Sequence, residues 1–221
     1  MLLDSLTTPP LPTAFKYLLD DGTPALFRLL RPEDSARLRS GFYALSRFSR
    51  RRHLLTESDE ISDEQIDRLA SVDQDRRVAW GAINLNKPEE PGIGFARYVV
   101  LRDDALSADV AMVVLDFYQG NGAGQILHAC LHLNAHMLGI RRFFYDVHTD
   151  NLRFIRLLKA LGARHEGRAD NVDRLSLPVY HRAWDVPAQN PLGMRFADVF
   201  RRLHKAEPMP VERFAPPPDE A

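Results

Sequence analysis

The chain has 221 residues, of which 45% are hydrophobic and 27% are charged, and its formal net charge is −1. This length is enough for one ordinary domain with a sizeable core, and the near-neutral charge argues against a general nucleic-acid binder, which is usually basic. The single cysteine, Cys130, excludes an internal disulfide, and no apolar run is long enough to span a bilayer, so we expect a cytoplasmic protein.

Strand and helix patterns alternate along the chain. In chain order we expect a strand at residues 25–30, helices at 31–45 and 62–71, strands at 77–85, 92–101 and 108–117, a helix at 124–138, a strand at 141–148, a helix at 151–162 and a strand at 173–180. Ser62 and Gln65 form a capping box at the start of one helix, and Gly162 ends another. The expected fold class is therefore α/β (α+β), with a mixed central sheet flanked by helices on both faces. The proline-rich ends, 7–13 and 215–221, are expected to be extended or disordered.

A glycine-rich loop, "YQGNGAGQ", occupies residues 118–125, between a predicted strand and the following helix. Glycine has no Cβ, so backbone N–H groups in such a loop can approach a phosphate closely. A Walker loop would need Lys and then Ser or Thr after its last glycine, and a dinucleotide-binding loop would need a further glycine in place of Gln125. The spacing Gln119-x-x-Gly122-x-Gly124 leaves two interpretations, a site for another phosphate compound and a plain strand-to-helix turn.

The loop and its surroundings resemble a known family. Residues 111–127, "AMVVLDFYQGNGAGQIL", followed by residues 151–163, "NLRFIRLLKALGA", resemble motifs A and B of the GNAT superfamily of acetyl-CoA-dependent N-acetyltransferases. Upstream, residues 29–82 are similar to the N-terminal half of the acetyltransferase domain in Pat-type protein lysine acetyltransferases, and the resemblance extends over residues 26–179. It implies the GNAT acyl-CoA N-acyltransferase fold and acetyl-CoA as co-substrate, without a metal.

The resemblance also implies a set of cofactor-binding residues. In the family, the backbone after the fourth strand holds the CoA pyrophosphate, which corresponds here to Gln119, Gly120, Asn121, Gly122, Ala123 and Gly124. The strand before it pairs through its main chain with the pantetheine arm, which corresponds to Met112, Val113 and Val114. Asn151 would hold the splayed strand and the cofactor arm, although an Asn at this place is also an ordinary helix N-cap.

Catalysis in this family is direct transfer of the acetyl group to an amine. A lysine-type amine has a pKa of about 10.4 and is almost fully protonated at neutral pH, so a general base is useful. In Pat-type enzymes a glutamate near the start of the fourth strand is the base, and the matching residue here is Asp109, which is one methylene shorter. Asp109 is therefore the predicted catalytic residue; a solvent-facing strand-end carboxylate is the other interpretation, and His148 is an alternative base. The family's general-acid Tyr position holds Leu158, so no acid is assigned.

Charge suggests a cationic acceptor. Residues 28–52 carry eight Arg against two acidic residues, whereas residues 57–75 carry eight acidic residues against one Arg. In GNAT folds the second segment borders the acceptor entrance, so an acidic wall would attract a protonated amine; an ordinary charged helix face is the alternative.

Two further patterns are interpreted as structural. His128, His132 and His136 recur at a spacing that can bind zinc, but a packed or solvated helix face explains it better. The amphipathic segment 193–206 could bind a membrane or a partner, and docking on its own domain or on a dimer mate explains it better.

The predicted organisation is an N-terminal extension (1–22), an N-acetyltransferase domain (23–182) and a C-terminal extension (183–221). The predicted function is transfer of an acetyl group from acetyl-CoA to a primary amine, with protein lysine as one acceptor. A small-molecule amine acetyltransferase and a non-catalytic acyl-CoA sensor are the alternatives. The expected partners are acetyl-CoA and the amine acceptor. Neither nucleic acid nor a membrane is expected as a partner, and a homodimer is left open.

Overall fold

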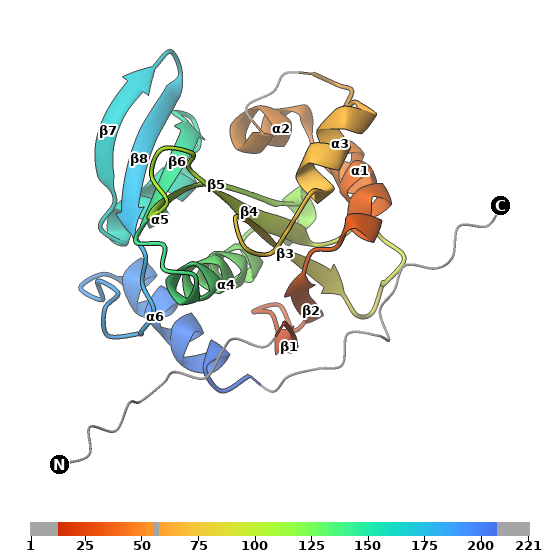
Figure 1. Cartoon of the computed structure of the whole chain (residues 1–221). Coiled ribbons are helices and arrows are strands. Elements are labelled where there is room, and N and C mark those ends of the chain that lie inside the picture. The colour runs from red at the N-terminus through yellow and green to blue at the C-terminus, as the bar shows by residue number, and fades with distance from the viewer. Residues whose placement is uncertain (1–12, 55–57, 207–221) are drawn as a thin grey trace.

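The computed structural model describes residues 13–54 and 58–206 (Figure 1). One sheet contains the strands β1 (Ala14–Leu18), β2 (Pro24–Leu29), β3 (Arg77–Asn84), β4 (Gly94–Val100), β5 (Ser107–Val114), β6 (Arg142–His148), β7 (Arg164–Ala169) and β8 (Val172–Pro178). The helices are α1 (Ser35–Ala44), α2 (Arg47–Leu54), α3 (Asp63–Ala70), α4 (Ala123–Met137), α5 (Leu152–Ala160) and α6 (Pro191–Leu203), with short 3₁₀ turns η1 (Pro32–Asp34) and η2 (Asp116–Tyr118). The proline-rich ends expected from the sequence lie outside the described residues, apart from Thr13.

Every strand and helix predicted from the sequence is present, and the α/β class with a mixed sheet is confirmed. The capping box is also confirmed, because the Gln65 N–H donates to Ser62 Oγ and the Ser62 N–H donates to Gln65 Oε1. Gly162 ends α5 with a φ of 90°. No helix in the described part of the chain is long and apolar enough to cross a membrane.

Three elements were not predicted: β1, α2 and β7. The β7 sequence, "RHEGRA", is exposed at the sheet edge and has no buried face that would produce an alternating pattern. The α2 sequence, "RFSRRRHL", is dominated by arginine and carries little apolar periodicity. The predicted strand at 108–117 ends earlier than expected, because residues after Val114 turn into η2.

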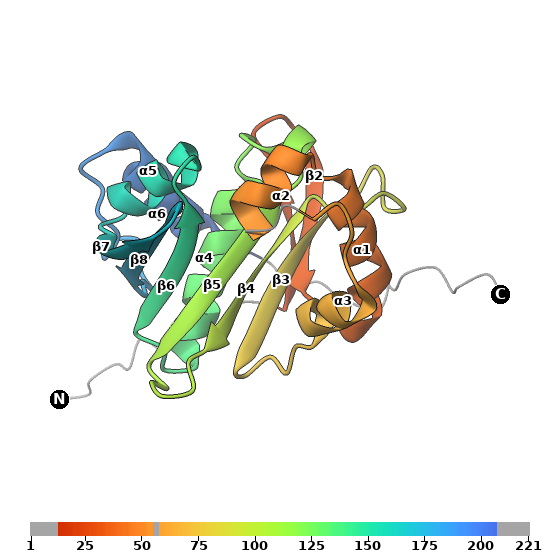
Figure 2. The ribbon, with the colours of Figure 1, turned by 90° about the horizontal axis from the view of Figure 1, so that it is seen from above.

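The strand order is β1-β2-β3-β4-β5-β6-β8-β7, and of the neighbouring strands that the structure describes only β5 and β6 run parallel. These two strands pair over a short stretch, from Ser107 with Arg142 to Val110 with Tyr145. Beyond Val110, β5 continues beside β4 to Val114 but no longer pairs with β6. The sheet therefore splits between its two central parallel strands, which lie next to each other in Figure 2.

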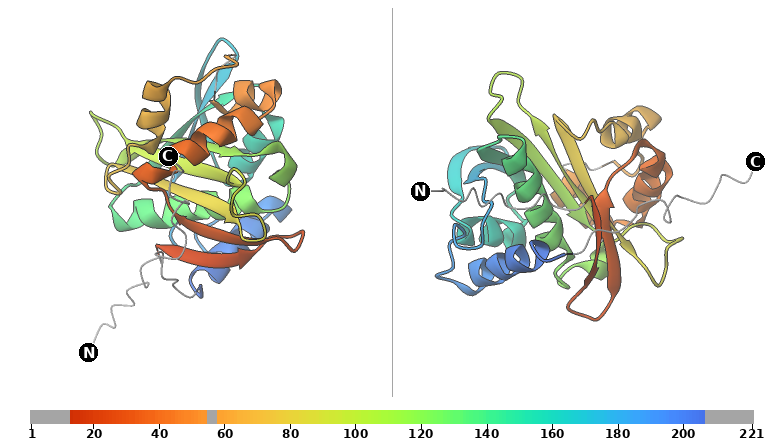
Figure 3. Two further views of the ribbon diagram at one scale, coloured as in Figure 1. Left: turned by 90° about the vertical axis from the view of Figure 1, so that its right-hand side faces the viewer. Right: turned by 60° about the horizontal axis from the view of Figure 1, so that its bottom comes forward.

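Helices cover both faces of the sheet. The right-hand view of Figure 3 shows α4 and α6 on one side and α1 and α3 on the other. Helix α2 contacts β5 and β6 at the split. The main core lies between the sheet and α4, and its largest fully buried side chains include Trp80, Tyr98, Phe143 and Tyr145.

Helix α6 is part of this core. Phe196 and Phe200 are 0% exposed and pack against the rings of His128 and His132, which are equally buried on α4. The amphipathic tail thus docks on its own domain, as the sequence favoured. The two histidines fill a packed interface, and no group of His, Cys, Asp or Glu suited to a metal occurs among the described residues.

Candidate active site

A cleft opens where β5 and β6 diverge, with a free volume of about 250 Å³. Its walls come from α2, the end of β5, the glycine loop, α5 and α6. The lining residues are Phe48, Ser49, Arg52, Met112, Val114, Asp116, Tyr118, Gln119, Gly120, Gly122, Gly124, Gln125, Asn151, Arg153, Phe154, Leu157, Leu192 and Arg195. Most residues predicted to bind the cofactor are therefore brought together in one cleft.

The glycine loop forms one end of the cleft. Gly120 and Gly122 have φ values of 97° and 94°, which side chains other than glycine rarely adopt, and α4 begins immediately after Gly122. A Cβ at Gly122 would lie 3.1 Å from Asp20 Oδ2 and 3.2 Å from Arg195 Nη2. The loop is thus shaped by glycine and closely approached by charged side chains.

Neighbouring side chains hold this loop in place. Gln119 Nε2 donates to the carbonyl of Val114 and to Asp116 Oδ1, each at 3.1 Å. On the other side, Asn121 Nδ2 donates to Asp21 Oδ2 at 3.3 Å, and its Oδ1 accepts the N–H of Ala123. Hydrogen bonds lower the pKa of Asp21, chiefly the one from the Thr23 N–H, with a smaller contribution from Asn121. Asn121 and Ala123 therefore support the loop and are not among the residues that line the cleft.

Three arginines from different helices face the cleft. Arg52 of α2 donates to the carbonyl of Asp150 and lies 3.8 Å above the Phe48 ring. Arg195 of α6 forms an ion pair with Asp20. Arg153 of α5 approaches the Cβ position of Gly120 at 3.2 Å. From the sequence, the basic run Arg50–Arg52 is interpreted as solvated, with an arginine near the adenosine phosphate of the cofactor as the alternative. The sequence gives no signal for the arginines of α5 and α6.

The end of β5 supplies the wall of the cleft. Met112 and Val114 line it, whereas the side chain of Val113 points to the opposite face of the sheet. Because pairing with β6 ends at Val110, the backbone of residues 111–114 has no strand partner on that side in the described part of the chain. This edge can pair with the main chain or amides of a ligand.

Asn151 occupies the head of α5. It is 4% exposed, lines the cleft, and its Oδ1 accepts the Phe154 N–H at 3.4 Å. Asn151 therefore both caps α5 and lines the cleft.

Asp109 lies outside the cleft, on the sheet face that Val113 shares. Its side chain is 48% exposed, and its Oδ1 accepts a hydrogen bond from Arg174 Nη2 at 2.6 Å. The same guanidinium contacts Asp146 Oδ2 at 2.9 Å and lies 4.8 Å from the centre of the Phe144 ring. A cation thus already occupies the position beside two carboxylates and an aromatic face.

The alternative base, His148, is buried, and both of its ring nitrogens are hydrogen-bonded. Its Nε2 lies 3.3 Å from Arg51 Nε, and its Nδ1 accepts the Asp150 N–H at 3.2 Å. Leu158, at the position where the family's general acid would stand, is fully buried in the core. No acid comes from that position.

Ion pairs reduce the charge asymmetry seen in the sequence. Asp63 pairs with Arg39, and Asp59 pairs with both Arg47 and Arg50. The acidic segment is therefore partly neutralised by the basic one, and the exposed carboxylates that remain on α3 form a weaker wall than the sequence predicted.

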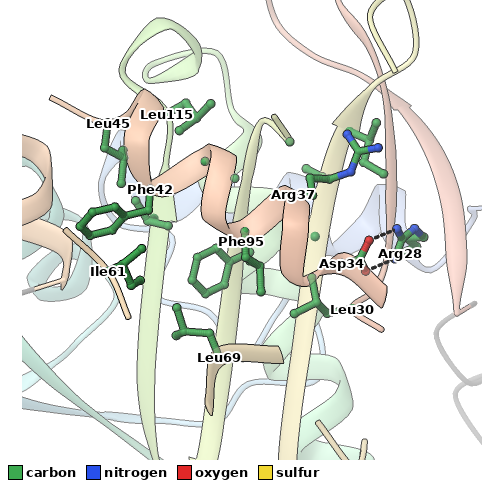
Figure 4. A pocket seen from close by; sticks show the side chains of 18 residues that line it. Arg28, Leu30, Asp34, Arg37, Phe42, Leu45, Ile61, Leu69, Phe95 and Leu115 are labelled. Atoms are coloured by element: carbon green, nitrogen blue, oxygen red, sulfur yellow. Dashed lines mark hydrogen bonds and ion pairs between the residues drawn. The ribbon is translucent and has the colours of Figure 1, made fainter. Parts of the chain in front are cut away.

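A second cavity lies on the other face of the sheet, beneath α1 (Figure 4). It is lined mainly by apolar side chains such as Phe42, Ile61 and Phe95, and its free volume is only about 50 Å³. At one end, Arg28 and Asp34 form a buried ion pair with contacts of 2.5 and 2.7 Å. Because Arg28 and Asp34 are paired with each other and Arg37 donates to the carbonyl of Glu90, this cavity offers less chemistry than the cleft.

Comparisons with known proteins agree with the geometry. Residues 25–164 match the family model described as an acetyltransferase (GNAT) domain. Acetyltransferase PA5475 of Pseudomonas aeruginosa is 31% identical over 164 residues, which cover 74% of this chain and 86% of that protein. Acetyltransferase Pat of Mycolicibacterium smegmatis is 40% identical over 73 residues, which cover 33% of this chain and only 22% of that longer protein.

A solved structure gives the same picture. The GNAT domain of S. lividans PAT superposes with a TM-score of 0.67 at 25% sequence identity. The superposition covers 75% of this chain and 96% of that domain.

Proposed function

The chain belongs to the GNAT acetyltransferase family, and we propose that it transfers the acetyl group of acetyl-CoA to the side-chain amine of a protein lysine. One observation carries this proposal: the cleft at the split between β5 and β6 ends in the glycine loop at the start of α4. The preference for lysine rests on similarity to the Pat-type proteins, and the preference for acetyl-CoA rests on the family and on the shape of the cleft.

The residues present suit the CoA part of this substrate. The unpaired edge of residues 111–114 can hydrogen-bond the pantetheine amides as an added strand would. Gly120 and Gly122 leave room for a pyrophosphate where a Cβ would intrude, and the amino end of α4 and the nearby arginines favour negative charge. Asn151 fixes the start of α5 across the cleft from β5.

Asp109 is our candidate base. The acceptor arrives as an ammonium ion and must lose a proton before its nitrogen can attack the thioester carbon. Arg174 now holds the Asp109 carboxylate. We infer that the ammonium displaces this guanidinium, or reaches Asp109 through one water, and gives one proton to the carboxylate. The neutral nitrogen then bonds to the thioester carbon, the C–S bond breaks, CoA leaves as the thiolate, and the second nitrogen proton passes to solvent. Thiolate departure does not require a dedicated acid, because a thiol pKa is near 8.5.

The test is release of free CoA thiol from acetyl-CoA in the presence of an acceptor panel. The panel contains lysine peptides, polyamines, amino acids and aminoglycosides. The proposal predicts the highest kcat/KM for a lysine peptide. A higher kcat/KM for a small amine would identify a small-molecule acetyltransferase. Acetyl-CoA binding without thiol release for any amine would identify a sensor.

A further inference from the structure

The last helix reaches into the cleft from outside the region that matches the family model. That region ends at residue 164, whereas Leu192 and Arg195 of α6 line the cleft. Burial of Phe196 and Phe200 fixes the helix against α4. The position of the Arg195 backbone is therefore set by the core of the domain.

The start of α6 is anchored as well. Asn190 caps the helix through the Gly193 N–H at 2.9 Å. Its Nδ2 donates to the carbonyl of Ala160, at the end of α5, also at 2.9 Å. The two helices that carry Arg153 and Arg195 are thus linked to each other.

Arg195 is paired with an acidic residue directly above the glycine loop. Its partner, Asp20, belongs to the turn between β1 and β2, and the Asp20 N–H donates to the carbonyl of Asn121 at 3.0 Å. The Arg195 and Asp20 side chains are 45% and 56% exposed. Ion pairs this exposed contribute little to stability, so the fold does not depend on this one.

Arg153 flanks the same loop from the other side. Its Nη2 lies 3.2 Å from the Cβ position of Gly120, and it has no hydrogen-bond or ion-pair partner among the described residues. A further charged group, Asp116, is engaged elsewhere, because it accepts hydrogen bonds from Ser46, Ser49 and Gln119. Two guanidiniums therefore border the loop, and one of them is held by the carboxylate of Asp20.

We propose that Arg195 and Arg153 bind phosphate groups of the CoA nucleotide, and that Asp20 competes with those phosphates for Arg195. This inference rests on the proposed acetyl-CoA binding. A guanidinium forms stronger, often bidentate, hydrogen bonds with a phosphate than with an exposed carboxylate. Binding thus exchanges the Asp20–Arg195 pair for an Arg195–phosphate pair, and the C-terminal helix becomes part of the cofactor site.

The two halves of the ion pair then have opposite effects on CoA binding. Arg195→Gln removes a phosphate ligand and should raise the Kd for CoA roughly tenfold or more. Asp20→Asn releases Arg195 and removes a negative charge from the site, so it should lower the Kd by about threefold. If the pair merely held α6 in place, both variants would weaken binding alike.

Calorimetric titration of the full chain with CoA tests this, with Arg201→Gln as a matched control on the exposed side of α6. Titration with pantetheine, which has no phosphate, should give the same Kd in wild type and in Arg195→Gln. Dephospho-CoA lacks the 3′-phosphate, so titration with it identifies the phosphate that Arg195 binds. If wild type binds dephospho-CoA and CoA with the same Kd, Arg195 binds the pyrophosphate. If the wild-type Kd is higher for dephospho-CoA than for CoA, and Arg195→Gln abolishes this difference, Arg195 binds the 3′-phosphate.

An unchanged CoA Kd in Arg195→Gln, or weaker binding in Asp20→Asn, would overturn the inference and leave the proposed function intact. Failure of the wild-type protein to bind CoA would instead overturn the proposed function, and the inference with it.

Discussion

Val110 and Tyr145 are the last residues at which β5 and β6 pair, and the cleft begins beyond them. Because β5 continues along β4 after this point, its other edge faces open space instead of β6. The glycine loop lies at the far end of that edge, where α4 starts. The site is thus a consequence of strand register.

Gly122→Asp should abolish CoA binding. The substitution places a carboxylate against the expected pyrophosphate, at a residue whose φ is 94°. In the parent protein, CoA at about a hundred times its Kd should stabilise the fold by about 2.7 kcal/mol, and the rise in Tm measures this. Gly139→Asp is a matched control, because Gly139 has a φ of 81° and open space around it. Normal binding in folded Gly122→Asp would show that the phosphate site has been misplaced.

Arg174→Gln should lower the KM for a cationic acceptor several-fold. The guanidinium occupies the position between Asp109, Asp146 and the Phe144 ring that a protonated amine would favour. Removing it leaves two carboxylates for the acceptor, and CoA affinity should stay unchanged. Steady-state kinetics with a lysine peptide measures both quantities. A KM equal to that of wild type would place the acceptor elsewhere.

The sequence predicted the fold well because its apolar runs mark buried elements directly. It failed at β7, whose "RHEGRA" sequence is exposed at the sheet edge, and at α2, whose arginines hide the helical periodicity. The spacing of the glycine loop left a phosphate site and a plain turn as alternatives, and the resemblance to the family favoured the phosphate site. Arg153 and Arg195 were not identifiable. Arg153 lies in the segment that resembles motif B, at a position to which the resemblance assigns no role, and Arg195 lies on α6, outside the resemblance; the two meet at the cleft only through tertiary packing.

Acid should destabilise the protein through the buried histidines of α4. Burial lowers the pKa of His128 from 6.5 to about 3 and that of His132 well below its usual value. Within residues 13–54 and 58–206, His128 Nδ1 and His132 Nε2 have no partner that could stabilise an added proton. Because both folded-state pKa values are lower than in the unfolded chain, their contribution to stability is complete above about pH 6.5 and is lost as the pH falls.

The size of this effect can be measured with His128→Phe. Each buried neutral histidine makes the free energy of unfolding fall by about 1.4 kcal/mol per pH unit once the unfolded chain is protonated. The free energy of unfolding, measured by urea denaturation between about pH 6 and pH 4, should therefore fall less steeply with decreasing pH in the variant than in wild type, by this amount per pH unit. Equal slopes in the two proteins would mean that His128 is protonated in the folded state.

Asp109→Asn should lower kcat by roughly 10²- to 10⁴-fold while CoA binding survives. The amide keeps the shape of the side chain but cannot accept the proton of the ammonium group. Activity should recover partly at high pH, where more of the amine is already neutral. Asp109→Glu is the control, since a longer carboxylate should retain activity. Wild-type turnover in Asp109→Asn at neutral pH would transfer the role to His148 or to solvent.

The proposed activity is acetylation of a lysine amine by acetyl-CoA bound at the glycine loop. The most direct measurement is mass spectrometry of a lysine peptide incubated with acetyl-CoA and either the wild-type protein or Gly122→Asp. We expect the wild-type protein to add the mass of one acetyl group to the lysine side chain, with an equal amount of CoA thiol released, and the variant to add none. An unmodified peptide with the wild-type protein would contradict the lysine acetyltransferase activity, and equal acetylation by both proteins would contradict acetyl-CoA binding at the glycine loop.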